Sequence, residues 1–402
     1  MKRLAVVVQR CGENVIGGSE SYALAASKVL SRHYDIEILT TTAKDHVTWD
    51  NYFQEGDEKV SDNLTIKRFR VDIGRSAYWH KLDGLYMSSI PIDFYANTAG
   101  KKREKILQSA GYMPLSFCEE WIKNEGPYSK RLLQFIRANN ERYSAFIFMT
   151  YIYAQTYFGV DEVADKSKVF MIPTYHNESP VFMPIFRKYK DCHQLFLTAA
   201  EKKFAEEVVY RSALKGSIIG FGLPDKFAPG ASPGRLKNYI LYAGRLEENK
   251  GVLELFKFFE HYYANNRKIK LITIGDGHLK NYRHEGIEYC GYVSEEKKLS
   301  LMQNAAAFIH PSRFESFGIV LIEAFMMGTP ALVNARCEVL KEHIDNSGAG
   351  YSYTDRNEFC SNLDKLLAGR ESNSDLAANA RSYFEKNYSI DSFYERLKGV
   401  VG

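Results

Sequence analysis

Short apolar runs alternate with amphipathic stretches along most of this 402-residue chain. In the first half, the runs that predict buried strands cover residues 4–9, 35–42, 64–71, 145–151, 169–176 and 194–198. Residues 19–31 predict a helix after the first strand. Runs that are apolar at successive positions, such as IFM and FMI, are typical of strands covered on both faces. The alternation of strands and helices indicates an α/β domain with a parallel sheet.

A second series of the same kind begins near residue 238. Its predicted strands cover residues 239–243, 270–274, 288–292, 307–310 and 330–333, and its predicted helices cover 251–265, 294–306, 317–327, 357–368, 374–387 and 390–400. Residues 221–236, between the two series, are rich in Gly, Pro and Ser, as an interdomain linker is. We therefore expect an N-terminal domain over 1–222, a C-terminal domain over 223–385, and a helix over 386–402 that could pack back on the N-terminal domain.

Residues 72–130 interrupt the alternation of strands and helices. The segment is aromatic and contains several glycine and proline residues that favour breaks. It predicts an insertion in the N-terminal domain, made of helices and loops. Such an insertion could shape a substrate site or could be a structural elaboration.

Composition and charge narrow the class of protein. Hydrophobic residues make up 45% of the chain and charged residues 25%, as in an ordinary globular protein. The net charge of +4 arises in residues 1–222, which hold 30 Lys and Arg against 26 Asp and Glu. This excess is too small to predict nucleic-acid binding. The cluster Lys101, Lys102, Arg103 and Lys105 fits either a solvated helix face or a peripheral contact with an anionic membrane.

Cysteine usage and hydropathy point to a cytoplasmic protein. The six cysteines are scattered and form no C-x-x-C pair, which predicts reduced thiols. No apolar run approaches the ~20 residues that a membrane span needs. We expect the chain in the cytoplasm, with a peripheral contact on the inner face of the membrane left open.

The strongest chemical signal is the segment HPSRFESFGIVLIEAFMMGTP, residues 310–330. Glu315 lies in a predicted loop, and Glu323 lies eight positions later on the predicted helix. Gly318 lies at the start of that helix, where free N–H groups and the helix dipole attract an anion or a sugar hydroxyl. Glu315 is therefore placed to accept hydrogen bonds from sugar hydroxyls. Glu323 lies among apolar residues and needs a partner, either a ribose diol or a buried Lys or Arg.

At these residues the sequence resembles the retaining glycosyltransferases of the GT-B fold, in particular glycosyltransferase family 4. That family carries an E-x7-E element followed by EA-x-x-x-G-x-P. The matching residues are Glu315, Glu323, Ala324, Gly328 and Pro330. The resemblance implies an α/β chain of two Rossmann-like domains, whose parallel sheets face each other across a deep cleft.

The resemblance also implies roles for single residues. Glu315 would contact the transferred sugar, and Glu323 would contact the ribose of the nucleotide. Phe317, Gly318 and Ile319 would offer backbone amides to the sugar or the phosphates.

Two upstream segments extend the resemblance. YAGRLEENKG, residues 242–251, looks like the donor-phosphate loop of the family, with Arg245 and Lys250 as its basic pair and Gly244 beside them. Two cations close to a diphosphate would neutralise the leaving group as its charge grows. Without the resemblance, an Arg and a Lys in a loop are ordinary surface residues. LITIGDGHL, residues 271–279, resembles the next family strand and loop and adds Gly275 to the expected substrate-binding residues.

The N-terminal half matches the family more loosely. GGSE, residues 17–20, resembles the glycine-rich loop after the first strand, where Gly17 and Gly18 would let the backbone approach a phosphate or the acceptor. His176, in TYHNE, matches a family histidine that contacts the donor sugar near the reacting centre, although a single histidine is more often structural. Its neighbours Asn177 and Glu178 are open candidates for acceptor contacts.

The sequence departs from the family pattern after the last predicted donor-site strand. Family members often carry a Gly-Gly pair followed by Pro-Glu there, whereas this chain reads VNARCEVLKEH over residues 333–343. Glu338 could take the place of that glutamate, but the glycines are absent. No family motif can be placed in residues 72–130.

The family resemblance implies retaining transfer of a hexose from a nucleotide diphosphate sugar to a hydroxyl of a glycan or lipid-linked glycan, in bacterial surface polysaccharide synthesis. No two Asp residues lie two positions apart, so the D-x-D metal element of the other major glycosyltransferase fold is missing, and we expect neither a metal nor another cofactor. Arg245, Lys250 and helix N-termini would meet the charge of the leaving diphosphate. Two alternatives stay open: a nucleotide-sugar 2-epimerase of the same fold, and a non-catalytic glycan-binding protein on the same scaffold.

Overall fold

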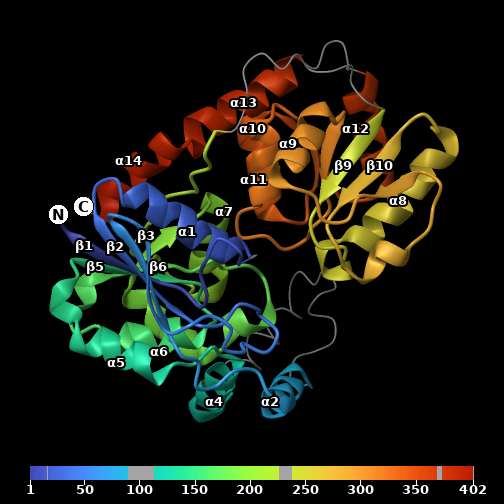
Figure 1. Ribbon diagram of the computed structural model, residues 1–402. Helices are drawn as coiled ribbons and strands as arrows, with labels where there is room; N and C mark the ends of the chain where they lie inside the picture. Colours follow the sequence, from blue (N-terminus) through green and yellow to red (C-terminus); the bar gives the residue numbers. More distant parts are fainter. Residues whose placement is uncertain (16, 89–112, 226–237, 369–373, 402) are drawn as a thin grey trace. The chain divides into compact units, whose positions relative to one another are not determined.

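The computed structural model describes residues 1–15, 17–88, 113–225, 238–368 and 374–401. Contacts between Cα atoms divide the chain into two compact units. Unit 1 comprises Met1–Leu197, Glu201–Phe221 and Tyr394–Gly402, and unit 2 comprises Thr198–Ala200 and Gly222–Phe393. Each unit is built around a mainly parallel sheet with helices on its faces, as Figure 1 shows.

In the described part of unit 1, eight strands form one sheet in the order β3-β4-β2-β1-β5-β6-β7-β8. Their bounds are β1 Arg3–Val7, β2 Asp35–Thr41, β3 Gly56–Ser61, β4 Leu64–Phe69, β5 Ala145–Met149, β6 Val169–Ile172, β7 His193–Phe196 and β8 Gly216–Ile218. Neighbouring strands are parallel except at the β3–β4 edge, which is antiparallel. The six strands that the sequence predicts in this half are all confirmed, and β3 and β8 are additional.

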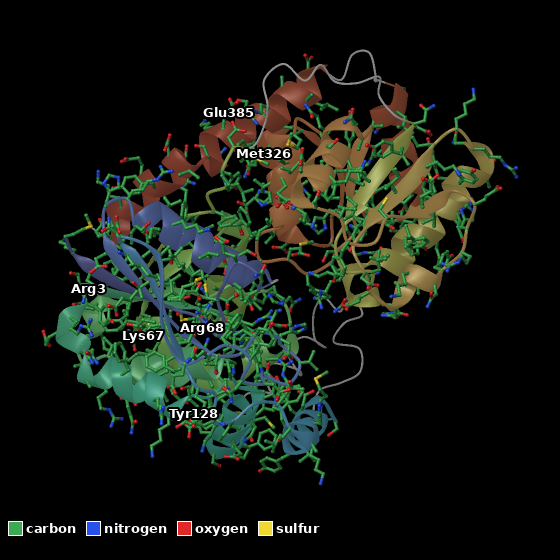
Figure 2. All side chains as sticks on the ribbon, viewed as in Figure 1. Arg3, Lys67, Arg68, Tyr128, Met326 and Glu385 are labelled. Atoms are coloured by element: carbon green, nitrogen blue, oxygen red, sulfur yellow. The ribbon has the colours of Figure 1, made fainter. Side chains whose placement is uncertain are left out.

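The edge strand β3 shows why the hydrophobic pattern misses it. Its sequence GDEKVS is exposed along almost its whole length. Pairing with β4 brings Asp57 opposite Lys67, with which it forms an ion pair, and Glu58 pairs with Arg68. Figure 2 labels Lys67 and Arg68. Such a charged edge strand prevents further strands from adding to the sheet. It carries no apolar alternation, so the hydrophobic pattern gives no signal for it, and backbone pairing with β4 together with these ion pairs holds it in place.

Helices cover both faces of the unit 1 sheet. They are α1 Gly18–Leu30, α2 Ala77–Ser88, α4 Leu115–Glu125, α5 Lys130–Ala138, α6 Ala154–Glu162, the part of α7 Ala199–Phe204 from Glu201 onward, and the part of α14 Ile390–Val401 from Tyr394 onward. The predicted insertion contains α2 and α4. It is attached through an ion pair between Arg75 and Glu125, and Trp49 Nε1 donates to the Glu125 carbonyl oxygen at 2.7 Å. The basic cluster at residues 101–105 lies outside the described residues, so its membrane contact stays a prediction.

In the described part of unit 2, six parallel strands form a sheet in the order β11-β10-β9-β12-β13-β14. Their bounds are β9 Tyr239–Ala243, β10 Lys270–Ile274, β11 Ile287–Tyr289, β12 Ala307–His310, β13 Ala331–Asn334 and β14 Gly350–Tyr353. The helices are α8 Val252–Asn265, α9 Glu295–Asn304, α10 Ile319–Met326, α11 Glu338–Ser347, α12 Arg356–Ala368 and α13 Ser374–Tyr388. The predicted strands are confirmed, and β14 and α11 are additional.

The last two described helices belong mainly to different units: α13 lies in unit 2, whereas most of α14 groups with unit 1. In α13, Arg381 donates to the carbonyl oxygen of Met326 at the end of α10 at 2.6 Å, and to Glu385 at 2.7 Å (Figure 2). In α14, residues from Tyr394 onward group with unit 1, where Arg396 Nε donates to the Ile219 carbonyl oxygen at 2.8 Å. Among the described helices, none is both long enough and apolar enough to span a bilayer.

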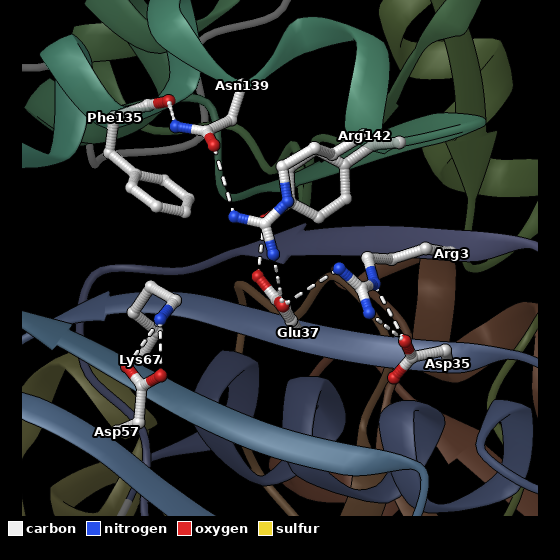
Figure 3. A network of polar contacts seen from close by, with 9 residues as sticks. Arg3, Asp35, Glu37, Asp57, Lys67, Phe135, Asn139 and Arg142 are labelled. Carbon is white, nitrogen blue, oxygen red and sulfur yellow. Dashed lines mark hydrogen bonds and ion pairs between the residues drawn. The ribbon is translucent and has the colours of Figure 1, made fainter.

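A polar network lies at the amino ends of the central unit 1 strands (Figure 3). Arg3 of β1 pairs with Asp35 of β2 at 2.6 Å, and Arg142 Nη2 lies 3.2 Å from Glu37 Oε1. Tyr143, which precedes β5, donates to the other oxygen of Glu37. Open α/β sheets bind ligands at the opposite, carboxyl edge. We therefore assign this network to stability.

Replacing Glu37 with Gln should lower the unfolding free energy of unit 1 by about 1–2 kcal/mol, because the buried Tyr143 hydroxyl and the half-exposed Arg3 and Arg142 lose a charged acceptor. The three tryptophans all lie in unit 1, so their fluorescence during urea unfolding reports on this unit. The matched control is Glu141→Gln, because the Glu141 side chain is 96% exposed. Equal urea midpoints for both variants would show that the network does not stabilise the sheet.

Candidate functional site

Lys250 and Glu315 meet at the carboxyl edge of the unit 2 sheet. Lys250 ends the short helix Glu248–Lys250 after β9, and Glu315 lies in the loop between β12 and α10. Because β9 and β12 are parallel neighbours, the loops at their carboxyl ends share one edge. Lys250 Nζ donates to Glu315 Oε1 at 2.7 Å. The structure thus brings together two predicted site residues that are 65 positions apart.

The charge states at this edge follow from the burial of Glu315 and His310 and from the Lys250–Glu315 ion pair. Only 18% of the Glu315 side chain is exposed. Burial raises the pKa of the Glu315 carboxyl group, but the charges of Lys250 and His310 and hydrogen bonds from Lys250 and Ser312 outweigh it, and the pKa falls to about 2. Burial lowers the pKa of His310 to about 4. Around pH 7 the edge therefore holds a charged Lys–Glu pair beside a neutral imidazole.

Close backbone contacts fix the loops around the pair. Gly251 has φ 73°, and a Cβ atom there would lie 2.2 Å from the carbonyl oxygen of Pro311. Gly275 has φ 124°, and its Cβ would lie 2.0 Å from the carbonyl oxygen of Gly244. Only glycine fits such positions. The predicted site residues Gly244 and Gly275 thus bring the loops after β9 and β10 into backbone contact.

Arg245, the other predicted cation of this loop, is more exposed. Its Nη1 atom lies 3.1 Å from Glu247 Oε2, and 53% of its side chain is exposed. Its carbonyl oxygen accepts a hydrogen bond from Tyr242 at 2.8 Å, which fixes the backbone at this point. Arg245 therefore pairs with Glu247, whereas Lys250 pairs with Glu315.

The turn before α10 carries the predicted amide donors. Phe317 is buried, Gly318 adopts the left-handed conformation with φ 80°, and α10 begins at Ile319, two residues later than predicted. A Cβ atom on Gly318 would lie 2.7 Å from Leu340 Cδ2 of α11. The first N–H groups of a helix have no partner within the helix. The start of α10 therefore offers amide groups a few residues from Glu315.

His343, which the sequence does not mark, holds this turn. It lies fully buried on α11, with Nε2 2.8 Å from the Phe317 carbonyl oxygen and Nδ1 3.1 Å from the Tyr383 hydroxyl. Burial lowers its pKa to about 4. Because a carbonyl oxygen only accepts, the single proton of the neutral ring lies on Nε2, and Nδ1 accepts from the tyrosine.

Glu323 pairs with a lysine. The sequence leaves open whether its partner is a ribose diol or a buried Lys or Arg, and within the protein it is a basic residue. It lies on α10, 8% exposed, and its Oε2 atom is 2.8 Å from Lys298 Nζ of α9. Lys298 also pairs with Glu295 at 2.8 Å. Burial lowers the pKa of Lys298, but the two carboxylates raise it more. Contact between Glu323 and a ribose stays a prediction.

A second ion cluster joins the loops after β12 and β13. Glu254, in the first turn of α8, pairs with Arg313 at 2.6 Å and with Arg336 at 3.2 Å. Asn334 Nδ2 donates to the Pro311 carbonyl oxygen at 3.1 Å. Arg336 thus occupies the loop that lacks the family glycines, while Glu338 begins α11 and is exposed. The sequence gives no signal for this cluster, because its members are far apart in the chain.

In unit 1, the loop after β1 is held by a buried ion pair. Arg10 Nε donates to Glu20 Oε1 at 2.6 Å, and Gln9 Nε2 donates to the same oxygen at 3.0 Å. A Cβ atom on Gly17 would lie 2.1 Å from Glu20 Oε2, whereas one on Gly18 would meet no atom within 4 Å. A side chain at position 17 would therefore have to displace the buried Glu20 carboxylate, a group that the sequence does not single out. Contact of either glycine with a ligand stays a prediction.

His176 lies after β6, at the carboxyl edge of the unit 1 sheet. Its Nε2 atom is 3.1 Å from Glu178 Oε2, and its Nδ1 atom is 3.2 Å from the Thr174 carbonyl oxygen. Tyr151, after the neighbouring strand β5, donates to Glu178 Oε1 at 2.7 Å. Among the described residues, no group of three or more His, Cys, Asp or Glu side chains could hold a metal ion.

Comparisons with known proteins identify the C-terminal domain. Residues 231–383 match the family model described as Glycosyl transferases group 1. An uncharacterized glycosyltransferase of Methanocaldococcus jannaschii is 25% identical over 174 residues, which cover 40% of this chain and 44% of that protein. The capsular polysaccharide biosynthesis glycosyltransferase CapM of Staphylococcus aureus is 23% identical over 177 residues, which cover 40% and 46%. The matches thus span less than half of these curated relatives.

Solved structures identify the fold of the whole chain. Sucrose-phosphate synthase from Thermosynechococcus elongatus has a TM-score of 0.70 at 13% identity and covers 100% of this chain and 98% of its own. A TarM mutant from S. aureus, in complex with fondaparinux, alpha-GlcNAc-glycerol and UDP, has a TM-score of 0.66 at 12% identity and covers 100% of both chains. The chain has the GT-B fold, which confirms the expected pair of Rossmann-like domains. Within it, residues 231–383 form a glycosyl transferases group 1 domain.

Replacing Lys298 with Met should leave the buried Glu323 carboxylate without its cation and destabilise unit 2 by about 2–3 kcal/mol. Because unit 2 contains no tryptophan, the measurement is hydrogen exchange of the α9 and α10 amides. The control is Lys297→Met, which changes the exposed neighbour on the same helix. Equal protection of α9 and α10 in both variants would contradict a stabilising role for the pair.

Proposed function

We propose that this protein is a glycosyltransferase that moves a hexose from a nucleotide diphosphate sugar to a hydroxyl group of a glycan or lipid-linked glycan. The observation that carries the proposal is the 2.7 Å contact between Lys250 and Glu315. It joins the loop that resembles a donor-phosphate loop to the E-x7-E segment, and both lie in the glycosyl transferases group 1 domain. A cation and a carboxylate at one sheet edge suit a ligand with both phosphates and sugar hydroxyls.

The Lys250–Glu315 pair is proposed to open when the donor binds. Phosphate oxygens then take the place of the Glu315 carboxylate beside Lys250. A phosphate and a carboxylate are both oxyanions that pair with an ammonium group. The freed carboxylate of Glu315 accepts hydrogen bonds from the sugar hydroxyls. Arg245, exposed on the same loop, supplies the second cation for the diphosphate. The positive charge is thus in place before the leaving group develops its negative charge.

We propose two further contacts between the protein and the nucleotide-sugar donor. The ribose hydroxyls donate to Glu323, which Lys298 Nζ contacts at 2.8 Å. The amide groups of Phe317, Gly318 and Ile319 meet the sugar or the phosphates at the start of α10.

The transfer is proposed to retain the configuration of the sugar and to need no metal. A donor phosphate oxygen takes the proton of the acceptor hydroxyl, and His176 contacts the sugar near the reacting centre. Two relatives suggest the acceptor class. The description of CapM names capsular polysaccharide biosynthesis. O-antigen chain mannosyltransferase B of Escherichia coli is 29% identical to this chain over 123 residues. We therefore place the reaction in bacterial surface polysaccharide synthesis.

Thermal unfolding with UDP, GDP, ADP and CMP, and with their common sugars, should identify the donor. Ligand at about 100 times its dissociation constant adds ~2.7 kcal/mol to the stability of the folded state, which raises the melting temperature. We expect one nucleoside diphosphate and its sugar to raise it, with or without EDTA. An EDTA-sensitive shift would contradict metal independence, and no shift with any compound would contradict the donor site.

Once the donor is known, variants should separate chemistry from binding. Glu315→Gln should lower kcat by roughly 100-fold, with a smaller effect on donor affinity, because its contacts are made to the reacting sugar. The double variant Arg245→Gln with Lys250→Gln should lower transfer by at least about 1000-fold, because the leaving group loses both cations. Lys257→Gln, an exposed change on α8, is the control. Analysis of the products distinguishes transfer from epimerisation, and wild-type rates in the double variant would contradict the phosphate site.

A further inference from the structure

The two ring nitrogens of His176 both face oxygen atoms that accept hydrogen bonds. Nδ1 is 3.2 Å from the carbonyl oxygen of Thr174, which has no proton to give. Nε2 is 3.1 Å from Glu178 Oε2, and an ionised carboxylate also only accepts. A neutral imidazole has a proton on only one of its two ring nitrogens. In either tautomer, the lone pair of the other nitrogen would therefore face a lone pair of an oxygen atom. The doubly protonated ring satisfies both.

We propose that His176 acts as an imidazolium, which donates hydrogen bonds and positive charge to the substrate, and that Glu178 is the positioning residue that keeps it protonated. The inference rests on the proposed function, because it deepens the role of His176 in the sugar transfer. It also gives Glu178 a role different from the acceptor contact that the sequence leaves open.

The backbone around His176 keeps both contacts in place. Thr174 has φ 56°, a left-handed conformation that is uncommon for a β-branched residue and that turns the chain directly after β6. The next amide, that of Tyr175, donates to Glu201 Oε1 at 2.7 Å. The Glu178 amide donates to the His176 carbonyl oxygen at 2.7 Å, which holds the glutamate beside the ring. The Thr174 carbonyl and the Glu178 carboxylate are thus fixed relative to the imidazole.

Among the carboxyl groups of the described residues near His176, that of Glu178 contacts the ring. Glu178 faces the ring from the same loop, and its second oxygen accepts from Tyr151 after β5. Burial and the charge of Glu178 raise the pKa of Tyr151, so its hydroxyl stays a donor. Glu201 of α7 interacts with His176, but burial raises the pKa of Glu201 to about 8, so this carboxyl group is mostly neutral at pH 7. Burial likewise raises the pKa of Glu125 of α4, near Glu178, to about 7, so Glu125 is only partly charged at that pH. The carboxylate in direct contact is that of Glu178, and an adjacent negative charge favours imidazolium.

An imidazolium has no lone pair and is not a base. When a sugar or phosphate oxygen takes the place of Glu178 at Nε2, the imidazolium donates a hydrogen bond to that oxygen while Nδ1 stays on the Thr174 carbonyl, and its charge opposes the negative charge of a diphosphate. The acceptor proton then goes to another oxygen, in agreement with the proposed transfer to a donor phosphate. The pH dependence of activity distinguishes an imidazolium from a general base. If the imidazolium is required, activity falls as pH rises through the titration midpoint of His176. If a neutral base is required, activity falls as pH decreases through that midpoint.

The test is nitrogen-15 NMR of the full chain labelled at histidine, with the His176 signals assigned by their absence in His176→Gln. At pH 7 we expect ring-nitrogen shifts of the doubly protonated form. In Glu178→Gln the titration midpoint should fall by about 1 pH unit, and the exposed change Glu141→Gln should not move it. A neutral His176 ring at pH 7 in the wild type, or an unchanged midpoint in Glu178→Gln, would overturn the proposal.

The pH dependence of kcat/KM supplies the functional half of the test. We expect activity to fall on the alkaline side with the midpoint that NMR gives for His176, and Glu178→Gln should move both midpoints together. A fall on the acid side at that midpoint would identify His176 as a base and overturn the proposal. The NMR titration needs no substrate, so an absence of transfer with every donor would contradict the proposed function while the protonation state of His176 is still measured.

Discussion

A buried carboxylate is stable only when a cation or several hydrogen-bond donors meet it, and this constraint organises the loops at the carboxyl edges of both sheets. In unit 2, Lys250 after β9 meets Glu315 after β12. In unit 1, Arg10 after β1 meets Glu20 on α1. Each pair ties a loop to another segment of its own unit, so the position of the loop and the charge of the site depend on the same contact.

The two edges of the unit 1 sheet use ion pairs for different purposes. At the amino edge, Glu37 and its partners join the first residues of neighbouring strands and stabilise the sheet. At the carboxyl edge, the pair of His176 with Glu178 is about one-third exposed, so a ligand can reach it. Half-exposed charges cost less to separate than buried ones. Because open α/β sheets bind ligands at the carboxyl edge, the His176–Glu178 pair is placed to exchange an internal partner for a substrate, and the amino-edge network is not.

The apolar runs of the sequence predict most strands correctly, because strands covered on both faces need continuous apolar residues. They miss β3, whose charged residues pair across the strands, and β8 and β14, whose sequences GSI and GYSY contain no continuous apolar run. Lys250 and Glu315 can be predicted because each lies in a motif. Lys298 and His343 cannot, because their roles depend on tertiary contacts with α10 and with the turn before it. For Glu323, the sequence predicts that a partner is needed but does not determine which one.

The most direct test of the account is a crystal structure of the protein with the nucleoside diphosphate that binds to it. The distance to measure is that between Lys250 Nζ and the nearest phosphate oxygen. The account predicts a value below about 4 Å, the limit of an ion pair, with Glu315 displaced from its 2.7 Å contact. A nucleotide bound elsewhere, with the Lys250–Glu315 contact intact, would contradict the assignment of the donor site.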